Sequence, residues 1–132
     1  MIKLQYASNF DGFLVDFRVG PADELNNEMF GGEPVFTCKA GATVSADVLP
    51  AATFGCLVWV EKYDGSPESI ATLFHELVHA STLRFQKSGV LKREPRPKDV
   101  KGGLVSYDEL VANSVSELGT AFLYMLADDL RL

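Results

Sequence analysis

The chain is short of basic residues and of long apolar runs. Among its 132 residues, 12 are Lys or Arg against 18 Asp or Glu, so the net charge is −6 at pH 7. A general nucleic-acid binder needs a basic surface for its phosphate contacts, so this balance argues against that class and leaves open only a local basic patch. Uninterrupted apolar runs reach only a few residues, which argues against a membrane-spanning helix.

Cysteine is also scarce. Cys38 and Cys56 are too few for a disulfide framework, and their apolar, strand-like surroundings favour buried free thiols. The N-terminus lacks the pattern of a secretory signal. Because 47% of the residues are hydrophobic, the chain can build its own core. We therefore expect one globular domain over residues 1–132, in a reducing cytoplasm.

The first half of the chain has the pattern of short strands separated by turns. Alternation or apolar runs predict strands at residues 2–7, 13–19, 35–39, 43–49 and 55–62. The third and fourth flank Ala40-Gly41-Ala42 as in a hairpin. Pro21 opens a short predicted helix over residues 21–30, which Gly31-Gly32 ends.

The second half is helical. Ser66-Pro67-Glu68 combines an N-cap hydroxyl, a proline and a first-turn acid, and predicts a helix to about Lys87. Ser106 and Glu109 form a capping-box pattern that opens a second helix, which runs to about Asp129. The fold class is therefore α+β, with an N-terminal, mostly antiparallel sheet followed by two long helices.

The only two histidines stand four residues apart, in His75-Glu76-Leu77-Val78-His79. On a helix both imidazoles then face the same side and can share one cation. Glu76 lies about 100° around the helix from His75, where it can polarise a metal-bound water. A helical wheel places both histidines outside the apolar arc, which favours a metal site over two incidental surface histidines. The arc comprises Ile70, Leu73, Phe74, Leu77 and Ser81.

Catalytic zinc usually takes three protein ligands, and the lack of a third histidine excludes the metzincin type. The candidates for the third ligand are Glu109, Glu117 and Cys56. Glu109 is preferred because a seam of short side chains follows it and would let the histidine helix approach closely. The seam comprises Ala112, Asn113, Ser116 and Thr120, opposite a core face of Val111, Val115, Leu118, Phe122 and Met125. Alternatively, Glu109 only completes the capping box with Ser106.

These motifs resemble the gluzincin branch of the zincin-like metallopeptidases. The HExxH sequence from His75 to His79 is followed by Glu109-Leu110-Val111-Ala112-Asn113, similar to the Glu-x-x-Ala-Asn stretch of ImmA/IrrE-type domains. Residues 59–80 also resemble short phage-encoded metallopeptidases, and the resemblance covers about the last 75 residues. It implies one Zn²⁺ held by His75, His79 and Glu109. It further implies that Glu76 acts as general base in the hydrolysis of a polypeptide substrate.

Two further interaction sites are predicted, a strand that would pair with substrate and a basic connection between the two helices. In zincins a strand beside the active-site helix pairs with an extended peptide, and residues 55–62 would be that strand unless both its edges are occupied. The connection from Lys87 to Lys101 holds six of the twelve basic residues. It is either a solvated loop, a lid, or a site for an acidic partner such as the DNA bound by SprT-like proteases.

Two rival functions stay open. No downstream His or Tyr is evident as an oxyanion stabiliser, which favours a zinc-stabilised binding or structural protein without turnover. The presence of Glu76 opposes that reading, because zinc binding alone requires no base. The second rival is a hydrolase of another amide with Cys56 as ligand, since Gly55-Cys56-Leu57 faintly resembles the ligand motif of peptide deformylases.

Overall fold

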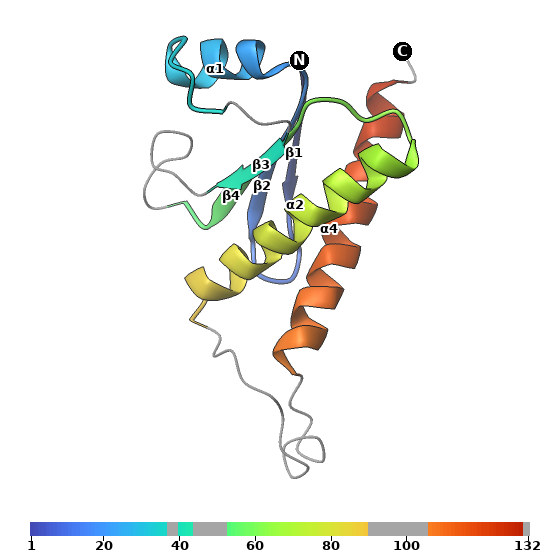
Figure 1. The fold of residues 1–132 in the computed structure, drawn as a ribbon. Coiled ribbons are helices and arrows are strands. Elements are labelled where there is room, and N and C mark those ends of the chain that lie inside the picture. Colours follow the sequence, from blue (N-terminus) through green and yellow to red (C-terminus); the bar gives the residue numbers. More distant parts are fainter. Residues whose placement is uncertain (37–39, 44–52, 90–105, 131–132) are drawn as a thin grey trace.

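A computed structural model describes residues 1–36, 40–43, 53–89 and 106–130. Within these residues the strands and helices follow in the order β1 (Ile2–Ala7), β2 (Leu14–Val19), α1 (Ala22–Phe30), β3 (Ala40–Thr43), β4 (Gly55–Val60), α2 (Pro67–Lys87) and α4 (Tyr107–Asp129). The fold class is α+β, as the sequence predicts. Figure 1 shows α2 and α4 side by side over one face of the sheet.

The four strands of the sheet stand in the order β1-β2-β4-β3. β1 pairs antiparallel with β2, and β3 antiparallel with β4, whereas β2 and β4 run parallel. Two of the three pairings are thus antiparallel, which confirms the mostly antiparallel sheet. The parallel pair is possible because the chain between β2 and β4 is long enough to cross back to the same end of the sheet.

One sequence prediction about the sheet is wrong. Ala40-Gly41-Ala42 is not a turn but part of β3, whose Ala40 lies opposite Val60 and whose Thr43 lies opposite Leu57. Small residues resemble a turn when considered locally, yet pairing with the buried strand β4 makes this segment a strand. The two hairpin strands predicted on either side fall mostly on residues 37–39 and 44–52, outside the described residues.

The core lies between the sheet and the two long helices. Alternate residues of β2 face it, and Phe17 packs against Phe122 of α4 with ring centroids 5.2 Å apart. All residues of β4 are buried, so both of its faces are covered. On β4, Trp59 donates from Nε1 to the Gly20 carbonyl at 2.9 Å, and its ring packs against the tilted ring of Phe36. The buried thiol of Cys56 is free, as predicted, whereas Cys38 lies outside the described residues.

Both long helices begin at the predicted residues. At the start of α2 the Ser66 hydroxyl accepts a hydrogen bond from the Ser69 N–H, and Pro67 occupies the first turn. At the start of α4 the Ser106 hydroxyl accepts from the Glu109 N–H at 3.1 Å. These caps satisfy backbone donors that a helix leaves unpaired at its N-terminus, which is why a local signal locates them.

The predicted contact between the two helices is wrong in detail. Glu109 and the short residues of the predicted seam, Ala112, Asn113, Ser116 and Thr120, are exposed. The helices instead approach closely at Gly119, where an added Cβ would lie 3.3 Å from the Phe74 ring and 3.4 Å from Leu77. A second contact is a hydrogen bond of 2.7 Å from the Ser81 hydroxyl to Ser114. Short polar residues fit a tight contact and a solvated face equally well, and here they face solvent.

By length and composition α4 could cross a membrane, which the lengths of uninterrupted apolar runs did not reveal. Core helices of soluble proteins share this property. In this fold Leu118, Phe122 and Leu126 of α4 pack in the core against the sheet. The apolar composition of α4 is therefore explained in part by its place in the domain.

A buried arginine joins the helices to the first hairpin. Arg84 of α2 donates to Asp11 from Nε and Nη2, each at 2.8 Å, and from Nη1 to Glu117 of α4 at 2.9 Å. Its Nη2 also donates to Ser8, and the Tyr6 hydroxyl donates to Glu117. We call these five residues the Arg84 network. Because a buried guanidinium is stable only when paired, the network fixes α2 and α4 relative to β1.

Candidate metal centre

The two histidines lie together on the exposed face of α2, opposite the residues that bury the helix. Leu73, Leu77 and Ala80 face the core, whereas His75 and His79 are exposed. Their Nε2 atoms are 3.2 Å apart, and their rings meet at 76° with centroids 4.8 Å apart. The separate histidine face predicted from the sequence is therefore present.

The spacing of the two nitrogens fits one shared metal ion. Two Zn–N bonds of about 2.0–2.1 Å at a tetrahedral angle place their nitrogens about 3.3–3.4 Å apart. The observed Nε2–Nε2 separation of 3.2 Å is close to this value. The separation is compatible with one zinc ion shared by the two rings, and it is also the length of an N–H···N hydrogen bond between them in the absence of metal.

Glu76 lies beside the pair but is buried. Its side chain is 8% exposed against 68% for His75, and its Oε1 atom is 3.8 Å from His75 Nε2. Burial raises the pKa of Glu76, and the two nearby histidines lower it by less. A raised pKa makes the carboxyl a better proton acceptor than an exposed glutamate, which is the property that a general base needs.

The candidates for the third ligand lie elsewhere. Glu109 is in the first turn of α4, and the Tyr107 ring two residues earlier packs on Phe85, so this turn lies near the end of α2 rather than beside His79. Glu117 is paired with Arg84. Cys56 is fully buried, and burial raises the pKa of its thiol to about 12, which disfavours the thiolate that metals bind.

Accordingly, no three His, Cys, Asp or Glu side chains among the described residues gather closely enough to hold a metal ion. The structure brings together His75, Glu76 and His79, and it does not bring Glu109 to them. The packing reason for preferring Glu109 is wrong, because its seam faces solvent. Glu109 as third ligand stays a prediction that rests on the resemblance of the Glu-x-x-Ala-Asn stretch alone.

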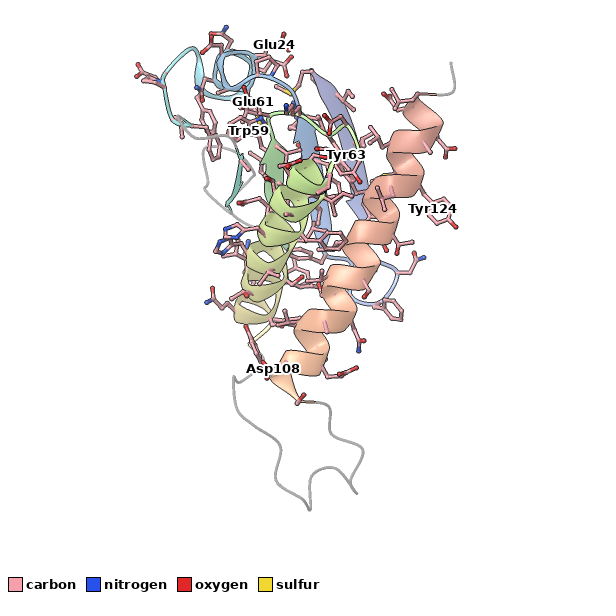
Figure 2. All side chains as sticks on the ribbon, turned by 45° about the vertical axis from the view of Figure 1, so that its right-hand side comes forward. Glu24, Trp59, Glu61, Tyr63, Asp108 and Tyr124 are labelled. Atoms are coloured by element: carbon pink, nitrogen blue, oxygen red, sulfur yellow. The ribbon has the colours of Figure 1, made fainter. Side chains whose placement is uncertain are left out.

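A cleft opens next to the histidine face. It has a volume of about 620 Å³ and is lined by Pro21, Glu61, Lys62, Glu68, Ser69 and Thr72. Thr72 precedes Glu76 by one helical turn, so the cleft begins on the same side of α2 as the candidate base. Figure 2 shows Glu61 beside the first turns of α2, at this end of the helix.

The strand predicted to pair with substrate is the wrong one. β4 stands between β2 and β3, so neither of its edges is free. In the sheet formed by the described residues the outer strand beside α2 is β3, which packs against that helix. The predicted basic connection falls mainly on residues 90–105, outside the described residues. Its first residue, Lys87, donates to the Thr53 carbonyl at 2.7 Å.

Sequence reasoning missed the role of Arg84. A signal for it was present, because position 84 follows Leu73, Leu77 and Ala80 on the buried side of α2. An arginine on a core-facing position needs buried acidic partners. Glu117, ranked low as a metal ligand, is one of them.

Comparison of the chain with known protein families, with curated proteins and with solved structures finds no match.

Proposed function

We propose that the protein is a zinc-dependent hydrolase of peptide bonds, with His75 and His79 as zinc ligands and Glu76 as general base. The observation that carries this proposal is the 3.2 Å separation of two histidine nitrogens directly beside a buried carboxylate. Two imidazoles suit zinc among the common divalent ions. A purely structural zinc site has no need of a buried acid next to its ligands.

In this mechanism the side chains have distinct tasks. His75 and His79 bind the ion as neutral imidazoles through Nε2. The chemistry that zinc supplies when bound is a water of lowered pKa, about 7, and a polarised substrate carbonyl. Glu76 accepts the proton of the attacking water and returns it to the leaving amine. Exposure of the histidine pair leaves room for a polypeptide to reach it.

A cleavage assay tests the function. We expect zinc-loaded protein to cleave members of a library of unstructured peptides, with new N-termini detected by mass spectrometry. Removal of zinc by a chelator should abolish cleavage, and added zinc should restore it. Stoichiometric zinc binding without any cleavage would contradict the hydrolase and favour the rival reading, a zinc-stabilised binding protein.

The resemblance makes Glu109 the proposed third ligand, and Glu109→Ala tests it separately. The loss of one of three donors should weaken zinc binding at least about tenfold, because catalytic sites use three protein ligands. Asp108→Ala, one residue earlier and also exposed, is the matched control. The affinity for zinc is measured by competition with a chromophoric chelator. Equal affinities for parent and Glu109→Ala would remove Glu109 from the site and leave the histidine pair in place.

A further inference from the structure

A second cavity lies on the other side of α2 from the histidine pair. It is bordered by the C-terminal end of α2, the first half of α4 and the turn between β1 and β2, in the lower part of Figure 1. Arg84, which lines it, stands about 140° around the helix from His79 and about 180° from His75. The cavity has a volume of about 430 Å³. This size falls in the range of about 300–1,000 Å³ that is typical of ligand sites.

The most deeply buried charged group of the cavity is Arg84, whose side chain is 4% exposed. A guanidinium has five N–H donors. Nε and Nη2 each donate to Asp11, and Nη2 also donates to Ser8. Nη1 donates to Glu117 and to Ser114. Because all five donors are used, an anionic ligand would find no free donor on Arg84.

The two carboxylates of the cavity, in contrast, keep free acceptor positions. Each carboxylate offers about four, so Asp11 and Glu117 together offer about eight. Hydrogen bonds from Arg84 and from other described residues occupy five of them, and the Ser8 hydroxyl can occupy a sixth. The side chain of Asp11 is 33% exposed and that of Glu117 is 15% exposed. A ligand that donates hydrogen bonds can therefore reach them.

The charge of the cavity is also negative. Burial alone would raise the pKa of Asp11 and of Glu117, but hydrogen bonds hold both below their ordinary values, so both are ionised at neutral pH. Two carboxylates and the single guanidinium of Arg84 leave an excess of one negative charge. Lys87, the next basic residue of α2, donates to the Thr53 carbonyl and does not line the cavity. Charge and hydrogen-bonding capacity thus both favour a cationic ligand.

Phe10 gives the cavity an aromatic wall. Its side chain is 88% exposed, more than that of any other large hydrophobic residue in the described part of the chain. Hydrogen bonds hold the turn that carries it, from the Phe10 N–H to Ser8 Oγ at 3.2 Å and from the Gly12 N–H to the Ser8 carbonyl at 2.9 Å. The face of an aromatic ring attracts positive charge. An exposed ring in a fixed turn beside two carboxylates therefore suits a cation with an apolar part.

We propose that this cavity binds an organic cation, an ammonium or guanidinium group carried on an apolar body. The cation donates hydrogen bonds to Asp11 and Glu117, and its apolar part packs on Phe10 and Leu110. Two sources share this chemistry, a free amine of low molecular mass and the side chain of a lysine or arginine in a polypeptide. Binding here does not depend on the proposed hydrolysis, because the histidine pair lies on the other side of α2.

Three probes of nearly equal shape test the preference for positive charge. Benzamidine is the cation, benzamide its neutral counterpart and benzoate the anion. Titration of the full chain at pH 7, followed by amide chemical shifts, should give a dissociation constant of about 1 mM for benzamidine. Benzamide should bind at least about tenfold more weakly because its hydrogen bonds are not charge-assisted, and benzoate should not bind. The shifts should centre on Phe10, Leu110 and Asn113.

A pair of exposed aromatic residues provides the variant and its control. Phe10→Ala removes the aromatic wall and should weaken benzamidine binding about fivefold. Because Phe10 is exposed, this substitution is not expected to unfold the domain, and melting curves check that it does not. Tyr124→Ala is the matched control, since Tyr124 is 72% exposed and does not line the cavity. It should bind benzamidine as the parent does.

A capped arginine peptide and its citrulline counterpart distinguish the two sources. Binding of the arginine peptide but not of the citrulline peptide would assign the cavity to a basic side chain of a polypeptide. Binding of benzamidine alone would assign it to a free amine.

Equal binding of benzamidine and benzamide would overturn the proposal, as would the absence of benzamidine binding. Unchanged affinity in Phe10→Ala would overturn it too. So would chemical shifts that centre on Glu61 and Glu68, because the cation would then bind at the cleft beside the histidine face.

Discussion

Glu76→Gln is expected to lower the rate of peptide hydrolysis about 10³-fold, because a positioned general base contributes about 10²–10⁴-fold. The amide keeps the size of the side chain but cannot accept the proton of the attacking water. Zinc content should be unchanged, since Glu76 lies beside the histidine pair and is not proposed as a ligand. The measurement is the single-turnover rate on the best peptide of the cleavage assay, for zinc-loaded protein.

The same variant has a second, independent readout. Because the pKa of Glu76 is raised, its contribution to stability is fully present below the ordinary carboxyl pKa and is lost as pH rises through the raised value. At neutral pH Gln removes this cost, so the zinc-free variant should be more stable than the parent, by about 1 kcal/mol. Glu33→Gln, an exposed acid far from α2 in the sequence, should change neither rate nor stability. Unchanged hydrolysis in Glu76→Gln would contradict the role of Glu76.

Arg84→Leu is expected to destabilise the domain by about 3 kcal/mol. Removal of one partner of a buried ion pair leaves uncompensated charge behind, at a cost of about 3–5 kcal/mol. Here the carboxylates of Asp11 and Glu117 lose their shared guanidinium. We place the effect at the lower end because a third of the Asp11 side chain is exposed. Urea denaturation measures it, with Gln86→Leu on the same helix as the exposed control.

At low pH the difference in the free energy of unfolding between Arg84→Leu and the parent should become smaller. Burial alone would raise the pKa of Asp11 and of Glu117, but hydrogen bonds, among them those from Arg84, hold both below their ordinary values. Stability from such lowered pKa values is present above about pH 4 and is lost as pH falls through the folded-state values. The stability difference should therefore shrink between pH 7 and pH 3. A difference that is constant with pH would show that packing, rather than charge pairing, stabilises this region.

Local signals in the sequence were enough to predict where the two long helices begin. Ser66 and Ser106 cap them as predicted, because a cap depends only on residues within one turn. The histidine pair was equally predictable, since its geometry follows from the helical repeat alone. The features that sequence reasoning located correctly are therefore those that depend on near neighbours in the chain.

Features set by distant contacts were missed. β3 is a strand because β4 lies beside it, although Ala40-Gly41-Ala42 by itself resembles a turn. The close contact between α2 and α4 is at Gly119. The sequence did not single out this residue, because α4 has many other short side chains. Arg84 can be buried because its guanidinium is paired with Asp11, which lies 73 residues earlier in the chain. The periodicity of one segment does not reveal which acidic residue of another segment will pair with an arginine in it.

We expect His75 and His79 to share one zinc ion. Element analysis of the purified protein, after dialysis against zinc and then against zinc-free buffer, tests it most directly. We predict about one equivalent of zinc in the parent and in Glu76→Gln, with a large loss in His75→Ala and in His79→Ala. Equal zinc contents in the parent, in His75→Ala and in His79→Ala would contradict the metal centre and the proposed hydrolase with it.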